Sequence, residues 1–162
     1  MESVISKMDE KTRKEIEEKI VPKYRTRRSA CMATMQLVQS QKGHLTKEDM
    51  EEIAALLGMQ PVEVEAVGKF YTMYNVERPV GRYHIQVCEN LSCSLMGGEH
   101  ILKHIERLLG IKTGETTSDK KFTLSTVQCL GSCGTAPVIQ INDDYYENLN
   151  EKKVEEILGK LR

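Results

Sequence analysis

The stretch YHIQVCENLSC (residues 83–93) decides the fold of the second half of this chain. Tyr83, Ile85 and Val87 alternate with polar residues, which is the pattern of a β-strand, and two cysteines with C-x4-C spacing follow directly. The stretch FTLSTVQCLGSCG (residues 122–134) repeats the arrangement with C-x3-C spacing. If the two strands are parallel neighbours, both loops lie at one edge of a sheet. The sequence therefore predicts that four thiols converge there: Cys88, Cys93, Cys129 and Cys133.

The segments around these strands predict helices and a hairpin. Residues 101–109 are strongly amphipathic and end at Gly110, so they are expected to form a helix. Residues 138–141 resemble a strand, and the turn-forming residues 142–144 precede a short return strand. A last helix follows Asn150 as its cap. The resulting order, β-α-β-β-β-α, is compatible with a small sheet layered against helices.

The first half of the chain has the periodicity of helices. Helices are expected after Asp9, over residues 27–41, from Thr46 to Gly58, and from Pro61 onward; Thr46 and Asp49 form the pattern of a capping box. A Pro and Gly-containing linker lies near residues 78–81. The chain is therefore expected to be α+β, with an N-terminal helical domain over 1–78 and a domain with a small sheet over 79–162.

Composition excludes several classes of protein. The chain has 162 residues, 40% of them apolar and 29% charged, and a net charge of −1. This balance indicates no general attraction to nucleic acid, and no apolar run is long enough to span a membrane. The N-terminal sequence has neither the apolar stretch of a signal peptide nor the character of a transit peptide. We therefore expect a cytoplasmic protein, in which thiols stay reduced.

Four clustered thiols have several uses. They match the ligand set of a [2Fe–2S] cluster, and Gly131 and Gly134 let the backbone come close to the sulfurs. The side chains of Asn90 and Ser92 are candidate hydrogen-bond donors to such sulfurs. Zinc usually takes a C-x2-C pair and redox thiols a C-x-x-C pair, and neither spacing is present. Spacing thus favours iron–sulfur over zinc and leaves both open.

Other signals have simpler explanations. Cys31 lies on the apolar stripe of a predicted helix and is expected to be a buried hydrophobe. His100 and His104 are four residues apart but have no third ligand, so we expect a solvated helix edge. Phe70, Tyr71, Met73 and Tyr74 are expected either in a partner surface or in the core.

Several motifs also resemble a known family. They are GKFYTMY (68–74), PVGRYHI (79–85), CENLSC (88–93), LGIKTGETT (109–117), QCLGSCGTAP (128–137) and NDDYY (142–146). In these motifs the chain resembles the E subunit of bacterial NADH:quinone oxidoreductase, a family that includes subunits of NAD-linked hydrogenases and formate dehydrogenases. The resemblance covers about residues 24–161, and all four cysteine positions of the family's motif are filled.

The resemblance implies a helical N-terminal region followed by a thioredoxin-like ferredoxin domain with a small mixed sheet. It implies one [2Fe–2S] cluster on the four cysteines, which exchanges single electrons with the FMN of a partner F-type subunit that oxidises NADH. A further iron–sulfur subunit is an expected partner, and the complex as a whole is expected to lie at the periphery of the inner membrane. In thioredoxin-like folds a proline at the place of Pro137 can be cis, so we hold a cis peptide there as a hypothesis.

No glycine-rich G-x-G-x-x-G loop follows a strand, so this chain is not expected to bind NADH itself or to carry catalytic residues. The N-terminal helices are candidates for docking the flavin subunit, or else they only cover the sheet. The alternatives are the equivalent subunit of a bifurcating hydrogenase or a formate dehydrogenase, a free-standing ferredoxin, and a zinc-bound interaction module.

Overall fold

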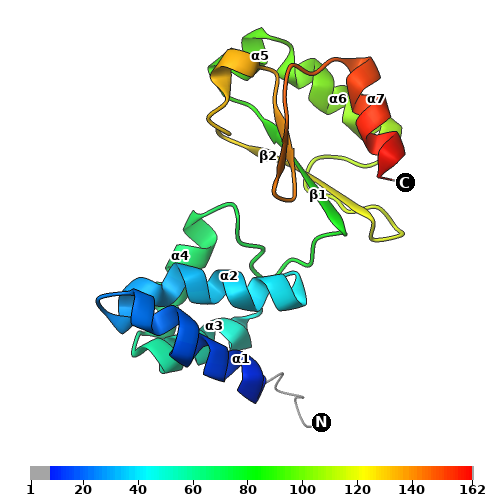
Figure 1. Cartoon of the computed structure of the whole chain (residues 1–162). Helices are drawn as coiled ribbons and strands as arrows, with labels where there is room; N and C mark the ends of the chain where they lie inside the picture. Colours follow the sequence, from blue (N-terminus) through cyan, green and yellow to red (C-terminus); the bar gives the residue numbers. More distant parts are fainter. Residues whose placement is uncertain (1–7, 162) are drawn as a thin grey trace. The chain divides into compact units, whose positions relative to one another are not determined.

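The computed structural model describes residues 8–161. The chain divides into two compact units, Met1–Pro79 and Val80–Arg162. Figure 1 shows the first unit as helices in blue to green, and the second as a sheet with helices in green to red. This is the α+β fold class that the sequence predicts. In residues 8–161, no helix has the length and apolar character needed to cross a bilayer.

From Glu10 to Phe70 the first unit consists mainly of helices. It contains α1 (Glu10–Glu15), a π-helical turn η1 (Ile16–Ile20), 3-10 turns η2 (Val21–Lys23) and η3 (Arg27–Ala30), and helices α2 (Cys31–Lys42), α3 (Lys47–Leu57) and α4 (Pro61–Phe70). The helix expected over 27–41 thus begins as a 3-10 turn. Fully buried side chains from α2, α3, α4 and η1 meet in one core, which includes Ile16, Met35, Ile53 and Val64.

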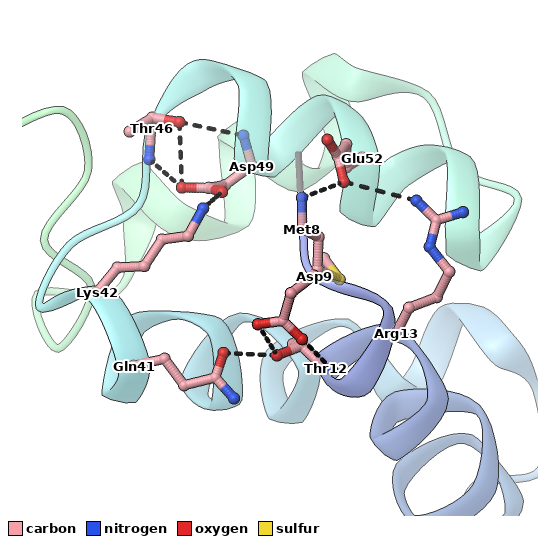
Figure 2. Close-up of polar contacts among 9 residues, drawn as sticks. All are labelled: Met8, Asp9, Thr12, Arg13, Gln41, Lys42, Thr46, Asp49 and Glu52. Atoms are coloured by element: carbon pink, nitrogen blue, oxygen red, sulfur yellow. Dashed lines mark hydrogen bonds and ion pairs between the residues drawn. The ribbon is translucent and has the colours of Figure 1, made fainter. Parts of the chain in front are cut away.

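The predicted capping box starts α3 (Figure 2). The Thr46 hydroxyl accepts from the Asp49 amide at 3.2 Å, and the Asp49 carboxylate accepts from the Thr46 amide at 3.0 Å. Asp49 is completely buried and also forms an ion pair with Lys42 at the end of α2. The side chain that starts α3 therefore also connects α2 to α3.

A second set of polar contacts connects the beginning of the described chain to the helices that follow (Figure 2). Asp9 caps α1 by accepting from the Thr12 amide at 2.6 Å. The Thr12 hydroxyl in turn donates to Gln41 of α2 at 2.8 Å, and the Met8 amide donates to Glu52 of α3 at 2.9 Å. These contacts hold α1 against both following helices.

The second unit contains a four-stranded mixed sheet. Its strands are β1 (Tyr83–Cys88), β2 (Phe122–Val127), β3 (Ile139–Ile141) and β4 (Asp144–Tyr146), in the order β2-β1-β3-β4. β1 runs parallel to β2 and antiparallel to β3, and β3 and β4 form a hairpin. The parallel pairing inferred from the sequence is therefore confirmed.

Two helices cover this sheet. α6 (Gly98–Leu109) packs against β1 and against α7 (Glu151–Lys160). α6 ends at Gly110, which takes the left-handed conformation with φ +67°, and Asn150 caps α7 by accepting from the Lys153 amide at 2.9 Å. The core between helices and sheet contains Ile85, Ile101, Ile105, Leu124, Ile139, Val154 and Leu158.

Candidate metal centre

The parallel pair β1 and β2 brings the two cysteine loops to one edge of the sheet. Cys88 is the last residue of β1 and stands opposite Val127, the last residue of β2. The Glu89 amide donates to the Val127 carbonyl at 3.0 Å, so the pairing continues into the loops. Cys129 follows two residues after β2. The convergence of the loops is thus a direct consequence of parallel register.

The first loop contains a short helix, α5 (Leu91–Leu95), which the sequence analysis did not predict. Asn90 begins it, because its side-chain oxygen accepts from the Leu91 amide at 2.9 Å. Cys93 lies on α5 and is 2% exposed, and Cys88 is 3% exposed. The side-chain oxygen of Asn90 thus caps the helix, and donation from its side-chain nitrogen to sulfur stays a prediction. This short helix turns the second cysteine of the pair back toward the first.

Gly98 makes this turn sterically possible. A Cβ at Gly98 would lie 2.8 Å from the carbonyl oxygen of Cys93 and 3.3 Å from that of Cys88. A real Cβ is essentially never found as close as 2.8 Å to such an atom, and the obstructing atoms belong to the backbone. The first residue of α6 must therefore be glycine for the first cysteine loop to close over it.

The second loop is exposed. Cys129 and Cys133 are both accessible to solvent, and Gly131 between them has φ +77°. In this conformation the Gly131 amide donates to the Cys129 sulfur at 3.3 Å, so the expected approach of backbone to sulfur is confirmed at this position. Cys133 begins a 3-10 turn, η4 (Cys133–Thr135), and the Ala136–Pro137 peptide that follows is cis, as hypothesised.

The thiols of both loops influence one another. Burial raises the pKa of the Cys88 thiol, but hydrogen bonds from the backbone amides of Asn90 and Leu130 and from the thiols of Cys93 and Cys129 outweigh it, so this pKa lies below its usual value. For Cys93, burial and the neighbouring Cys88 raise the pKa. The charge of Cys133 also acts on Cys93. All four predicted thiols therefore belong to one electrostatic group.

The four thiols match the donor set of a [2Fe–2S] cluster. Within residues 8–161, no three His, Cys, Asp or Glu side chains already surround a point as the ligands of one metal ion would. A [2Fe–2S] cluster takes four thiolates spread over two irons and two bridging sulfides. Two buried thiols on one loop and two exposed thiols on the other, with backbone amides aimed at sulfur, fit that donor set.

Cys31 lies apart from this group, in the helical unit. Its side chain is buried, its sulfur lies 3.8 Å from that of Met35, and burial raises the pKa of its thiol. The expectation of a small buried hydrophobe is confirmed.

The expectation for His104 was wrong. His104 is 8% exposed, and its two ring nitrogens each lie 3.2 Å from a glutamate of α7, Glu151 and Glu155. His100 is exposed as expected and lies 3.0 Å from Glu151. The position of His104, three residues after Ile101 on the apolar stripe, is the sequence signal that indicates its burial.

Known proteins are similar in sequence to this chain over nearly its whole length. The family model for the thioredoxin-like [2Fe-2S] ferredoxins matches residues 17–162. An E-type subunit (E 2) of the NADH-quinone oxidoreductase of Rhizobium meliloti (strain 1021) is 45% identical over 151 residues, which cover 93% of this chain and 89% of the relative. The E subunit of the NADH-quinone oxidoreductase of Rickettsia conorii is 47% identical over 148 residues, covering 90% of this chain and 88% of that protein.

A solved structure shows the same fold. The NAD+-reducing [NiFe]-hydrogenase in its air-oxidized state superposes with a TM-score of 0.66 at 20% identity. The match covers 78% of this chain but only 22% of the hydrogenase chain, so this chain spans a small part of that longer polypeptide.

Proposed function

Because the chain belongs to the thioredoxin-like [2Fe-2S] ferredoxin family, we propose that it is the electron-transferring E subunit of an NADH-quinone oxidoreductase. The observation that carries this proposal is the convergence of two cysteine loops in a chain 45% identical, over nearly its whole length, to a subunit of that name. Both of the relatives described above belong to a quinone-reducing complex, which favours this type of complex over the hydrogenase and formate dehydrogenase types.

One [2Fe–2S] cluster is the cofactor of this chain in our proposal. Its ligands are the four thiols of the two loops, namely Cys88, Cys93, Cys129 and Cys133. When bound, such a cluster accepts and releases one electron at a time.

The residues around the thiols stabilise charge on the sulfurs and control the access of water to them. The Asn90, Leu130 and Gly131 amides hydrogen-bond to ligand sulfurs and stabilise negative charge there. Burial of Cys88 and Cys93 keeps water from one side of the site, while the exposed Cys129 and Cys133 leave the other side open. We therefore expect electrons to enter and leave the cluster on the side of the second loop.

The partner follows from the chemistry of NADH. A hydride carries two electrons, so a flavin must separate them before a one-electron carrier accepts either. We place this FMN, together with the NADH site, on an F-type partner subunit, and we expect a further iron–sulfur subunit beside it. The helical unit, residues 1–79, is our candidate for docking the flavin subunit. In this assembly the chain is a peripheral subunit.

The test is metal analysis of anaerobically purified protein with EPR on reduction. Two irons and two acid-labile sulfides per chain, with an EPR signal that appears on reduction, support the proposal. Single Cys→Ala variants at the four positions are expected to lose iron and sulfide, whereas Cys31→Ala, in the other unit, keeps both. Zinc without sulfide in protein made with adequate iron, or a full cluster in all four variants, would refute the assignment.

A further inference from the structure

Three consecutive residues after β4 run along the second cysteine loop. Asn148 has φ +49°, and this left-handed turn lets its amide donate to the Thr135 carbonyl at 2.7 Å. The next amide, of Leu149, donates to the Pro137 carbonyl at 3.2 Å. The residue before them, Glu147, contacts the loop with its side chain. This segment therefore supports the loop from residue 132 to residue 137.

The Glu147 carboxylate receives two hydroxyls of the loop. Its Oε1 accepts from Thr135 Oγ1 at 2.8 Å and also from Ser132 Oγ. The two hydroxyl oxygens lie 2.8 Å from each other, so the three side chains form a closed set of contacts. Ser132 directly precedes Cys133, and Thr135 follows it by two residues. The carboxylate thus fastens both sides of the turn that carries Cys133.

The backbone around Glu147 is itself fixed. Lys153 of α7 donates to the Glu147 carbonyl at 2.6 Å, and the Thr135 amide donates to the Ser132 carbonyl at 3.2 Å. The charge on Glu147 is also secured, because the hydroxyls of Ser132 and Thr135 hold the pKa of its carboxyl below the usual range. At neutral pH the Glu147 side chain is therefore an ionised carboxylate whose backbone is held by a hydrogen bond from Lys153.

The loop needs such a support. Cys129, Gly131, Cys133 and Gly134 are all exposed, and between Cys129 and Thr135 only the partly buried Leu130 packs against an apolar cluster, so apolar burial gives this segment little support. Glycines at two positions of so short a loop also make it costly to order, because glycine has the greatest backbone freedom to lose. The contacts described above fix the Cys133 side of the loop, and they come mainly from residues 147–149.

We propose that Glu147 is a positioning residue for the cluster: it fixes Cys133 through Ser132 and Thr135, and its charge lowers the reduction potential. The inference rests on the proposed function, in which Cys133 is a ligand. Reduction adds negative charge to the cluster, and a carboxylate close to Cys133 disfavours that step. Loss of the carboxylate therefore makes the cluster easier to reduce, and loss of the whole side chain also loosens the ligand.

The experiment compares E147Q and E147A with wild type in redox titration, EPR and iron retention during air exposure. E147Q keeps the size and one acceptor oxygen but loses the charge, so its cluster is expected to persist with a raised midpoint potential. E147A is expected to show the raised potential together with broadened or shifted EPR features and several-fold faster loss of iron. The matched control is D143N, which removes one negative charge at the turn between β3 and β4, and it is expected to match wild type in EPR and iron retention.

The outcomes separate the two proposals. Wild-type protein without iron and sulfide would overturn the proposed function, and this inference with it. A wild-type cluster whose potential, EPR and lifetime are unchanged in E147A would overturn the positioning role of Glu147 alone. A potential in D143N raised as much as in E147Q would refute the local action of the Glu147 charge.

Discussion

Gly98 lies so close to Cys93 that a Cβ on the glycine would stand 2.8 Å from the cysteine carbonyl oxygen and 3.1 Å from its carbonyl carbon. Gly98 is the first residue of α6, and Cys93 lies on the preceding short helix α5. The backbone at the start of α6 is therefore packed directly against the backbone of Cys93. Any side chain at position 98 moves one relative to the other.

Gly98→Ala is expected to destabilise the protein and to lower its cluster content. Overpacking of this kind costs roughly 1–3 kcal/mol, and the displaced atoms belong to the loop between two ligands. Urea unfolding gives the free energy, and iron per chain gives the cluster content. Gly159→Ala in α7 is the matched control, because its Cβ meets nothing within 4 Å. That variant is expected to gain about 0.5–1 kcal/mol from helix propensity. Equal stability of the two variants would contradict the steric argument.

The parts of the site that depend on residues close together in the sequence could be predicted from it. Alternating apolar residues followed by cysteines mark β1 and β2, and parallel register then brings the loops together without further information. The capping box at Thr46 and Asp49 and the end of α6 at Gly110 are equally local, and both are present in the structure.

The contacts that sequence reasoning missed depend on distant partners. α5 has five residues, too few for helical periodicity, and only its cap Asn90 announces it. Glu147 contacts Ser132 and Thr135 across 15 and 12 positions, and the return of the chain through the hairpin β3–β4 brings them together. The α7 glutamates beside His104 are 47 and 51 positions away from it. Such contacts follow from packing, which a single sequence does not display.

Asp49→Ala is expected to lower the free energy of unfolding of the helical unit. The carboxylate is fully buried, accepts from the Thr46 amide and pairs with Lys42, so its loss removes a cap and an ion pair together (Figure 2). We expect a loss of about 2–4 kcal/mol, which is less than the full sum of a lost cap and a broken buried pair because the Lys42 side chain is 27% exposed and can be solvated. Thermal unfolding followed by circular dichroism measures it.

The control for this variant is Glu51→Ala, which removes an exposed carboxylate from the same helix. It is expected to stay within about 0.5 kcal/mol of wild type, as surface substitutions usually do. A loss in the Glu51 variant as large as that in the Asp49 variant would mean that the charge of α3, and not the buried contacts, sets its stability.

The environment of His84 is expected to make the free energy of unfolding depend on pH. Burial lowers the pKa of its imidazole in the folded protein, and its Nε2 lies 2.8 Å from the Ser125 hydroxyl across the β1–β2 pair. The unfolded chain therefore binds a proton near pH 6.5 that the folded chain refuses. Stability from this group is complete above about pH 6.5 and is lost as pH falls through that value to the lower folded pKa.

The measurement is the free energy of unfolding at about pH 7.5 and about pH 5.5, on either side of the unfolded pKa, in wild type and in His84→Gln. Glutamine does not titrate, so the variant is expected to lose less stability between the two pH values. The difference between the proteins isolates His84 from the other histidines. An equal or larger loss in the variant contradicts the assignment.

The end of α4 and the segment that follows it expose aromatic and sulfur-containing side chains to solvent. Phe70 is 77% exposed with its ring centroid 4.9 Å from that of Tyr71, and Met73 is exposed as well. Tyr74 differs from its neighbours, because it is buried and its hydroxyl donates to the Met32 carbonyl at 2.9 Å. Of the four residues expected in a partner surface or in the core, Tyr74 lies in the core, and Phe70, Tyr71 and Met73 stay candidates for a partner surface.

Phe70→Glu is therefore expected to weaken binding of the flavin subunit at least ~10-fold, because buried aromatic anchors carry much of the energy of an interface. The side chain is already in water, so folding and the EPR signal of the isolated protein are expected to match wild type. Pull-down and titration with the partner measure the affinity. Tyr145→Glu is the control, since Tyr145 is an exposed aromatic on β4 of the other unit. Undiminished binding by the Phe70 variant would remove this surface from the docking proposal, and equal loss in both variants would show that added charge, and not the site, weakens the complex.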